Sequence, residues 1–388
     1  MQSCRVFSNE HLLAPRWVDD VYNFAVEGKP YMTNPFKKHL FKLAFVLFIA
    51  GCSSNPTTES SSYPETINYP QTTAPVKPII PVQPKIPSYS SSGSYGSSYG
   101  GSYGTSGNYA DSYAVKSFIR HMVQTHGFSE SYLEGLFAQA QRLDSVIKLE
   151  GPSSSNSGPS RPGSWSRYRG KFLTEQHISN GVEFWRDNAE AISRASSSYG
   201  VDPEYIVGII GVETYFGKNI GKTCVFDALT TLSFDTFRRS KYFQSELENF
   251  LLMTREEGYN PRQPVGSWAG AMGLGQFMPS SFRKLAVDFD RNGRRDLWQP
   301  YDAIGSVAHY FSRNGWDYKS PVAQPASGSY GSSVIELSTY EGMEYWLVHP
   351  NFKVIKRYNN SNKYAMAVHQ LAQAIKSRYQ YSQVGANY

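Results

Sequence analysis

The stretch that decides the fold covers residues 204–213 and reads EYIVGIIGVE. It is apolar on nearly every side, and Ile206, Ile209 and Ile210 recur at the spacing of one helical face. Glu213 is the next position on that face. The pattern predicts a buried helix that ends in a carboxylate.

Glu213 has two readings at this position. Apolar surroundings disfavour the charged carboxylate and raise its pKa from about 4.3 toward neutrality, which suits a general acid. Alternatively, Glu213 has a structural role at the helix end and pairs with Lys218 of the next turn. The helix alone favours neither reading.

Helical signals continue on both sides of this stretch. Asp202 and Pro203 predict its start, with a capping residue followed by proline at the first helical position. Gly127 predicts a helix end, and Ser129 and Thr174 are candidate caps. The expected helices are: one from near Tyr113 to Gly127, one from Ser129 through Phe137, one long helix from Thr174 to Tyr199, one over Ser245 to Arg255 and one over Tyr301 to Ser312.

Short apolar segments near the end of the chain predict strands at Ser333–Leu337, Tyr345–Val348 and Phe352–Ile355. The fold class is therefore mainly α (α+β), with a small β element at about 320–356. The catalytic region is expected to cover residues 113–388.

A low-complexity segment precedes this region. Residues 53–112 are rich in Ser, Thr and Pro and then in Ser, Tyr and Gly, with few aliphatic residues. Such a segment cannot bury enough apolar surface to fold, so a disordered linker is expected here.

Residues 1–52 contain an export signal that begins at Met32. Lys37, Lys38 and Lys42 precede an apolar run over residues 43–50, which is too short to span a bilayer. Small residues then stand directly before Cys52, as in a lipobox, so Cys52 is predicted to be lipidated. An ordinary secretory signal with a chance cysteine is the alternative. Ser53 after the cysteine favours the periplasmic face of the outer membrane.

Charge and cysteine content exclude other classes. The formal charge of +6 falls to about +4 without residues 1–52, and no basic cluster alternates with aromatic residues, so nucleic acid is not an expected partner. Of the three cysteines only Cys224 remains in the mature region, which excludes an internal disulfide. Cys224 is expected to be a small buried hydrophobe.

Two further segments change the reading of Glu213. Residues 266–280 read GSWAGAMGLGQFMPS and residues 357–364 read RYNNSNKY. A glycine-rich turn lets a polymer approach the backbone, and amide and aromatic side chains suit sugars. Together with GVET at 211–214, these segments resemble the membrane-bound lytic murein transglycosylase B family over roughly residues 165–375.

The resemblance implies a lysozyme-like core and a lytic transglycosylase that cleaves the bond between N-acetylmuramic acid and N-acetylglucosamine. The matching Glu213 would act alone as general acid and base, with 1,6-anhydromuramic ends as product, unlike the usual two-carboxylate scheme. The family's substrate contacts fall on Tyr168, Ser267, Gln276, Tyr310, Tyr358, Asn359 and Tyr364.

This chain departs from the family at Tyr215-Phe216, where many members have Arg-Trp, and the segment between Gln276 and Tyr358 is shorter. Two alternative functions remain open at this point. A hydrolytic muramidase would use a second carboxylate, and a non-catalytic peptidoglycan-binding lipoprotein would have no need of Glu213.

A third pattern, DFDRNGRRD at 288–296, matches the start of an EF-hand loop. Its oxygen ligands would be Asp288, Asp290, Asn292, the Arg294 carbonyl and Asp296. The twelfth position is Gln299 rather than Glu, so Asp302 is a candidate substitute, and a polar turn without metal is the alternative.

The expected cofactor is a structural Ca²⁺, with no organic cofactor. Expected partners are peptidoglycan glycan strands, the outer membrane through the lipid anchor, and other cell-wall enzymes.

Overall fold

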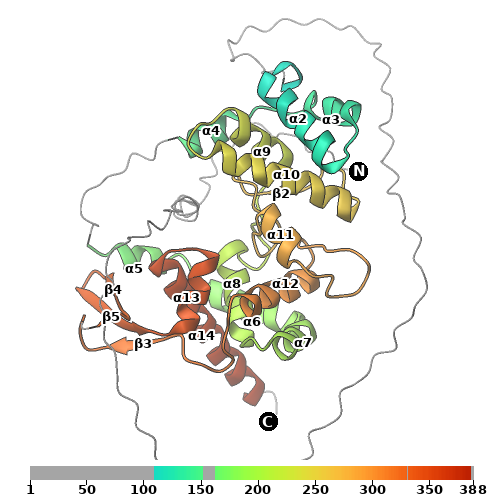
Figure 1. Ribbon diagram of the computed structural model, residues 1–388. Helices are drawn as coiled ribbons and strands as arrows, with labels where there is room; N and C mark the ends of the chain where they lie inside the picture. Colours follow the sequence, from blue (N-terminus) through green and yellow to red (C-terminus); the bar gives the residue numbers. More distant parts are fainter. Residues whose placement is uncertain (1–108, 152–161, 330, 386–388) are drawn as a thin grey trace, which may run out of the picture. The chain divides into compact units, whose positions relative to one another are not determined.

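The structure, a computed structural model, describes residues 109–151, 162–329 and 331–385, which are mainly helical as predicted (Figure 1). The first half contains η1 Tyr109–Asp111, α2 Tyr113–His126, α3 Glu130–Phe137, α4 Asp144–Glu150, α5 Ser164–Arg169, α6 Glu175–Asp187, α7 Ala189–Tyr199 and α8 Pro203–Thr214. The second half contains α9 Val225–Phe234, α10 Ser240–Glu257, α11 Pro279–Leu285, α12 Pro300–Arg313, α13 Pro350–Tyr358 and α14 Asn362–Gly385.

Helix α8 is the centre of the packing. Every side chain from Glu204 to Thr214 is buried, and the helix contacts α6, α7, α12 and α14. Gly208 allows α14 to come close, because a Cβ there would stand 3.0 Å from the Ala372 Cβ and 3.1 Å from the Val368 carbonyl oxygen. The predicted buried helix is confirmed, and its carboxyl end is held from several sides.

Several helix ends lie where the local sequence predicted them. The Ser129 and Thr174 side chains accept hydrogen bonds from the backbone N–H groups of Tyr132 and His177, so both are caps. Gly127 ends α2 in the left-handed conformation. Asp202 precedes α8 but makes no cap bond.

Three expectations were wrong in detail. The long helix expected from Thr174 to Tyr199 is two helices, because Asn188 leaves the helical conformation and its side-chain amide donates to the Phe184 carbonyl. The segment Phe352–Ile355 is part of α13 and not a strand; Pro350 starts that helix at its first turn. Ordered structure begins before Tyr113, with Tyr109 buried in η1.

The β structure is small. Strands β3 Ala323–Ala326, β4 Val334–Ser338 and β5 Met343–Val348 form an antiparallel sheet in the order β3-β5-β4, with Gln324 opposite Leu347 and Ile335 opposite Trp346. A two-stranded pair joins β1 Thr223–Cys224 to β2 Val265–Gly266. This pair ties the chain after α8 to the start of the glycine-rich segment.

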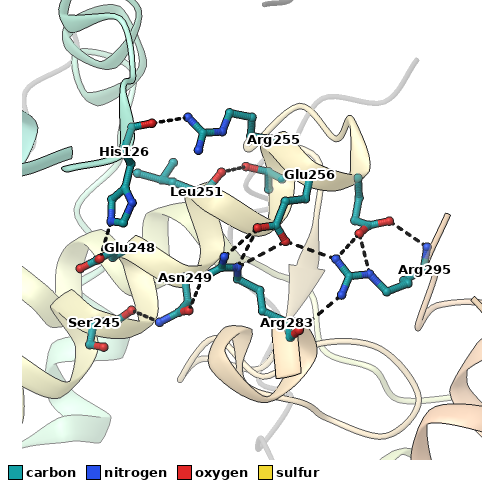
Figure 2. A network of polar contacts seen from close by, with 11 residues as sticks. His126, Ser245, Glu248, Asn249, Leu251, Arg255, Glu256, Arg283 and Arg295 are labelled. Atoms are coloured by element: carbon teal, nitrogen blue, oxygen red, sulfur yellow. Dashed lines mark hydrogen bonds and ion pairs between the residues drawn. The ribbon is translucent and has the colours of Figure 1, made fainter. Parts of the chain in front are cut away.

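Helix α10 is held by a polar network (Figure 2). Arg283 of α11 donates to Glu256 and to Asn249, and Arg295 of the following loop donates to Glu256 and Glu257. The network fixes the loop after α11 against the carboxyl end of α10.

The export signal, Cys52 and all but the last residues of the linker lie outside the described residues. Within the described residues, no helix combines the length and apolar character that crossing a membrane requires. Cys224 is buried, as expected.

Candidate active site

Glu213 is buried in the last turn of α8, with 4% of its surface exposed. Burial raises the pKa of this carboxyl from 4.5 to about 7, although a hydrogen bond from Tyr364 acts in the opposite direction. Lys218, the alternative ion-pair partner, lies instead over the Tyr215 ring with its nitrogen 5.5 Å from the centroid. At neutral pH Glu213 can therefore both donate and accept a proton.

Three tyrosines surround this carboxyl. The Tyr364 hydroxyl, from the first turn of α14, donates to the Glu213 Oε1 at 2.5 Å. The rings of Tyr358 and Tyr310 lie 4.6 Å apart, and the charge of Glu213 raises the pKa of both hydroxyls in addition to their burial. The pKa reaches about 12 for Tyr310, so these hydroxyls are donors at physiological pH.

The glycine-rich segment 266–280 is hydrogen-bonded to residues that lie beside Glu213. The Thr214 hydroxyl, next to the acid, donates to the Leu274 carbonyl at 3.0 Å. The Tyr358 hydroxyl donates to the Gly275 carbonyl at 2.7 Å, and a side chain at Gly275 would crowd that hydroxyl. Helix α8, the segment 266–280 and the end of α13 are thus linked directly to one another.

Ser267 and Gln276 lie within this segment. The Ser267 hydroxyl accepts from the Ala271 N–H, and the Gln276 side-chain amide donates to the carbonyls of Gly273 and Ile220. Gln276 has a positive φ of 51°, which is unfavourable for a side chain of this kind. Such conformations are held by their surroundings and gather at functional sites.

Asn359 follows Tyr358 and is almost fully buried. Both polar atoms of its side-chain amide lack a hydrogen-bond partner among the described residues. A buried polar atom without a partner costs about 1–3 kcal/mol, so the unpaired amide indicates a place for a polar ligand group.

Tyr168 of α5 lies close enough to Tyr364 to affect it electrostatically. Its ring is buried and stacks with Trp165, and its charge contributes to the raised pKa of Tyr364. The charge of Glu213 therefore raises the pKa of Tyr310, Tyr358 and Tyr364, and Tyr168 raises the pKa of Tyr364 as well.

Two features of the site were not predicted as part of it from the sequence. Tyr215 and Phe216 both have positive φ, at 53° and 60°, and so turn the chain sharply after the acid. The His177 ring packs on Tyr215 with centroids 4.6 Å apart and bonds the Gly211 carbonyl. The unusual pair Tyr215-Phe216 was a signal in the sequence, whereas nothing in it pointed to His177.

The loop after α11 gathers three carboxylates. Oxygens of Asp288, Asp290 and Asp302 lie within 4.8 Å of one another. Gly293 at the sixth place has φ 91° and donates its N–H to Asp288 Oδ2. Carboxylate oxygens around a sharp glycine turn are the ligands that Ca²⁺ prefers, so the residues fit that ion.

The other expected ligands lie in the same loop with different contacts. The Asn292 amide donates to Asp290 and its oxygen accepts from the Arg294 N–H, while the Asp296 carboxylate accepts from the Trp298 N–H. Gln299 precedes α12 as its first flanking residue. Asp302, rather than Gln299, therefore brings the closing carboxylate to the cluster.

Comparison with known proteins agrees with this geometry. Residues 110–332 and 328–373 match the family described as "Transglycosylase SLT domain". Over 296 residues the chain is 46% identical to membrane-bound lytic murein transglycosylase B of Escherichia coli strain K12, which covers 67% of this chain and 82% of that protein.

Two solved structures extend the comparison. The Escherichia coli lytic transglycosylase Slt35 in complex with calcium is 44% identical with a TM-score of 0.66, covering 71% of this chain and 96% of that one. SltB3 of Pseudomonas aeruginosa in complex with NAG-anhNAM-pentapeptide is 25% identical with a TM-score of 0.57, covering 67% and 78%.

Proposed function

The chain belongs to the transglycosylase SLT domain family, and on this premise we propose that it cleaves the β-1,4 bond between N-acetylmuramic acid and N-acetylglucosamine and leaves 1,6-anhydromuramic ends. It is a lytic transglycosylase that acts on peptidoglycan. The observation that carries the proposal is the buried Glu213, whose pKa of about 7 suits proton transfer in both directions.

The reaction needs two proton transfers. Neutral Glu213 gives its proton to the glycosidic oxygen as the bond from C1 to that oxygen breaks. The ionised carboxylate then removes the proton from the C6 hydroxyl of the muramic residue as that oxygen bonds to C1. Because Tyr364 occupies Oε1, we assign both transfers to Oε2.

The surroundings of Glu213 fit a sugar substrate. The unpaired amide of Asn359 can both donate to and accept from an N-acetyl group. The rings of Tyr310 and Tyr358, packed near Phe277, offer flat apolar surface of the kind that pyranose rings contact. Ser267 and Gln276 are the further polar side chains that we propose contact the sugar.

A single carboxylate is favoured over the pair that a hydrolytic muramidase would use. The other buried carboxylates of the described chain have partners of their own: Glu150 with Arg239, Asp202 with Trp316, Glu204 with Lys376, Asp227 with Arg262, Glu246 with Ser280, Glu257 with Arg295, and Asp302 with backbone amides. The relative SltB3 was solved with an anhydro sugar, which supports the same product here.

Mass spectrometry of the products from purified sacculi tests the proposal. Wild type is expected to release anhydro ends, which lack one water relative to the reducing ends of a hydrolase. Glu213→Gln is expected to abolish release, while Glu183→Gln, at an exposed position of α6, retains it. Reducing ends from wild type, or anhydro products from Glu213→Gln, would contradict the mechanism.

We propose further that the loop 288–302 holds a structural Ca²⁺ through Asp288, Asp290 and Asp302. The relative Slt35 was solved with calcium. Asp302 lies in the first turn of α12, and Tyr310 is on the same helix. The ion would supply positive charge to three carboxylates and hold this helix in place.

We also propose that lipidation of Cys52 anchors the enzyme at the periplasmic face of the outer membrane. Small residues before Cys52 and the apolar run 43–50 support the anchor, and the Escherichia coli relative is named membrane-bound. Each buried methylene of an acyl chain adds about 0.8 kcal/mol to membrane binding, so two or three chains anchor firmly.

A further inference from the structure

Two histidines of α2 and one glutamate of α10 meet away from the glycan site. His126 Nε2 lies 2.6 Å from Glu248 Oε1, and His121 Nε2 lies 3.3 Å from Glu248 Oε2. One ring nitrogen of each histidine and one carboxylate oxygen all lie within 4.8 Å of one another. Figure 2 shows His126 pointing at Glu248 from the end of α2.

The three groups form a ligand set for a transition metal. Two imidazole nitrogens and one carboxylate oxygen occur together in zinc sites that keep a fourth position for water. Tetrahedral zinc with bonds of about 2.0–2.1 Å places its ligand atoms roughly 3.3 Å apart. The distance from His121 Nε2 to Glu248 matches this value, and His126 Nε2 lies nearer to Glu248, at 2.6 Å, and would shift outward to admit the ion. The two rings are nearly perpendicular, at 89°, with centroids 5.8 Å apart.

The surroundings orient these side chains. The Thr125 hydroxyl lies 3.2 Å from His121 Nδ1, so the ring N–H can bond outward while Nε2 faces the cluster. Arg255 donates to the His126 carbonyl at 2.8 Å and fixes the end of α2. Both ligand-bearing segments are helices, which hold a site more precisely than loops do.

Without a metal, the three side chains are joined by hydrogen bonds, His126 to Oε1 and His121 to Oε2 of Glu248. A divalent ion uses all three groups and leaves its remaining positions to water, since His121 is exposed and the other two are partly exposed.

We propose that His121, His126 and Glu248 form a binding site for a divalent transition-metal ion, with Zn²⁺ as the ion that their chemistry favours. The bound ion ties α2 to α10 at the point where hydrogen bonds already join His121 and His126 to Glu248. This site is separate from the loop 288–302, whose all-oxygen ligands favour Ca²⁺ instead.

Titration of the full chain with Zn²⁺ tests the proposal by calorimetry in a non-chelating buffer at pH 7.5. We expect one site that is weakened at least about 10-fold by His126→Ala or Glu248→Gln and about 10-fold by Thr125→Val, which removes the support of His121. Glu130→Gln, at an exposed position of α3, and the double variant Asp288→Ala with Asp290→Ala are expected to retain the affinity.

X-ray absorption of the wild-type chain loaded with one Zn²⁺ gives a result that does not depend on the folding of variants. Two imidazoles and additional oxygen ligands are expected around the metal. A spectrum without two imidazoles, or equal affinity of wild type, His126→Ala and Glu248→Gln, would overturn the site. Circular dichroism of each variant shows whether a lost affinity reflects the ligand or the fold.

Discussion

Replacing Glu213 by glutamine is expected to stabilise the fold at alkaline pH while it removes activity. In the folded chain Glu213 is buried and prefers the neutral form, whereas in the unfolded chain it ionises near 4.5. Between these two pKa values the native chain binds a proton that the unfolded chain has lost. The stability of wild type therefore falls as pH rises toward 7 and levels off above it.

The size of the effect follows from the pKa. A rise from 4.5 to about 7 corresponds to about 3 kcal/mol between strongly acidic and alkaline solution, and to about 2–3 kcal/mol between pH 5 and pH 8. The neutral amide of Glu213→Gln does not titrate and can still accept from Tyr364. Relative to wild type, the variant is therefore expected to gain roughly 2–3 kcal/mol over this pH interval.

Thermal and urea unfolding at pH 5, 6, 7 and 8 measures this difference. About 3 kcal/mol corresponds to roughly 6–12 °C in midpoint for a region of this size. Glu183→Gln makes the same chemical change on the surface of α6 and serves as the control. If wild type, Glu213→Gln and Glu183→Gln gave parallel stability curves across this range, Glu213 would not be held neutral by burial, and the reasoning would fail.

Three further outcomes are expected. Tyr364→Phe removes the hydrogen bond that lowers the pKa of Glu213, so the pH–rate profile on sacculi moves to higher pH; an unmoved profile would separate the two groups. Wild type unfolds at a higher temperature in 10 mM CaCl₂ than in EDTA. Its free energy of unfolding rises by about 1.4 kcal/mol if calcium is at ten times its Kd, and Asp288→Ala with Asp290→Ala shows no such gain. Cys52→Ser loses labelling by a palmitate analogue, and retained labelling would disprove the anchor.

Features that depend on neighbouring residues were predictable from the sequence. The apolar run of α8, the caps at Ser129 and Thr174 and the helix end at Gly127 all rest on contacts within a few residues. The position of Glu213 follows from the same helical period. Its raised pKa was expected because burial was expected.

Other features were not predictable in this way. Two of them are local: the split at Asn188 comes from a side-chain bond to Phe184 that competes with the helix, and apolar residues at 352–355 fit a strand as well as a buried helix. The others depend on distant contacts. The place of Asp302 in the carboxylate cluster depends on how α12 folds back. Both His121 and His126 are more than 120 residues from Glu248 in the sequence, so only the fold brings the histidines to the glutamate.

The bond between Glu213 and Tyr364 joins positions 151 residues apart. During synthesis, the helix with Glu213 leaves the ribosome before Asn359 and Tyr364 do. Contacts between residues so far apart in the sequence form late in folding, because closing the loop between them costs entropy before the contacts stabilise the chain. An unfinished or unfolded chain therefore has the acid without its partners, and the capacity to cut the cell wall arises only when the last helix docks.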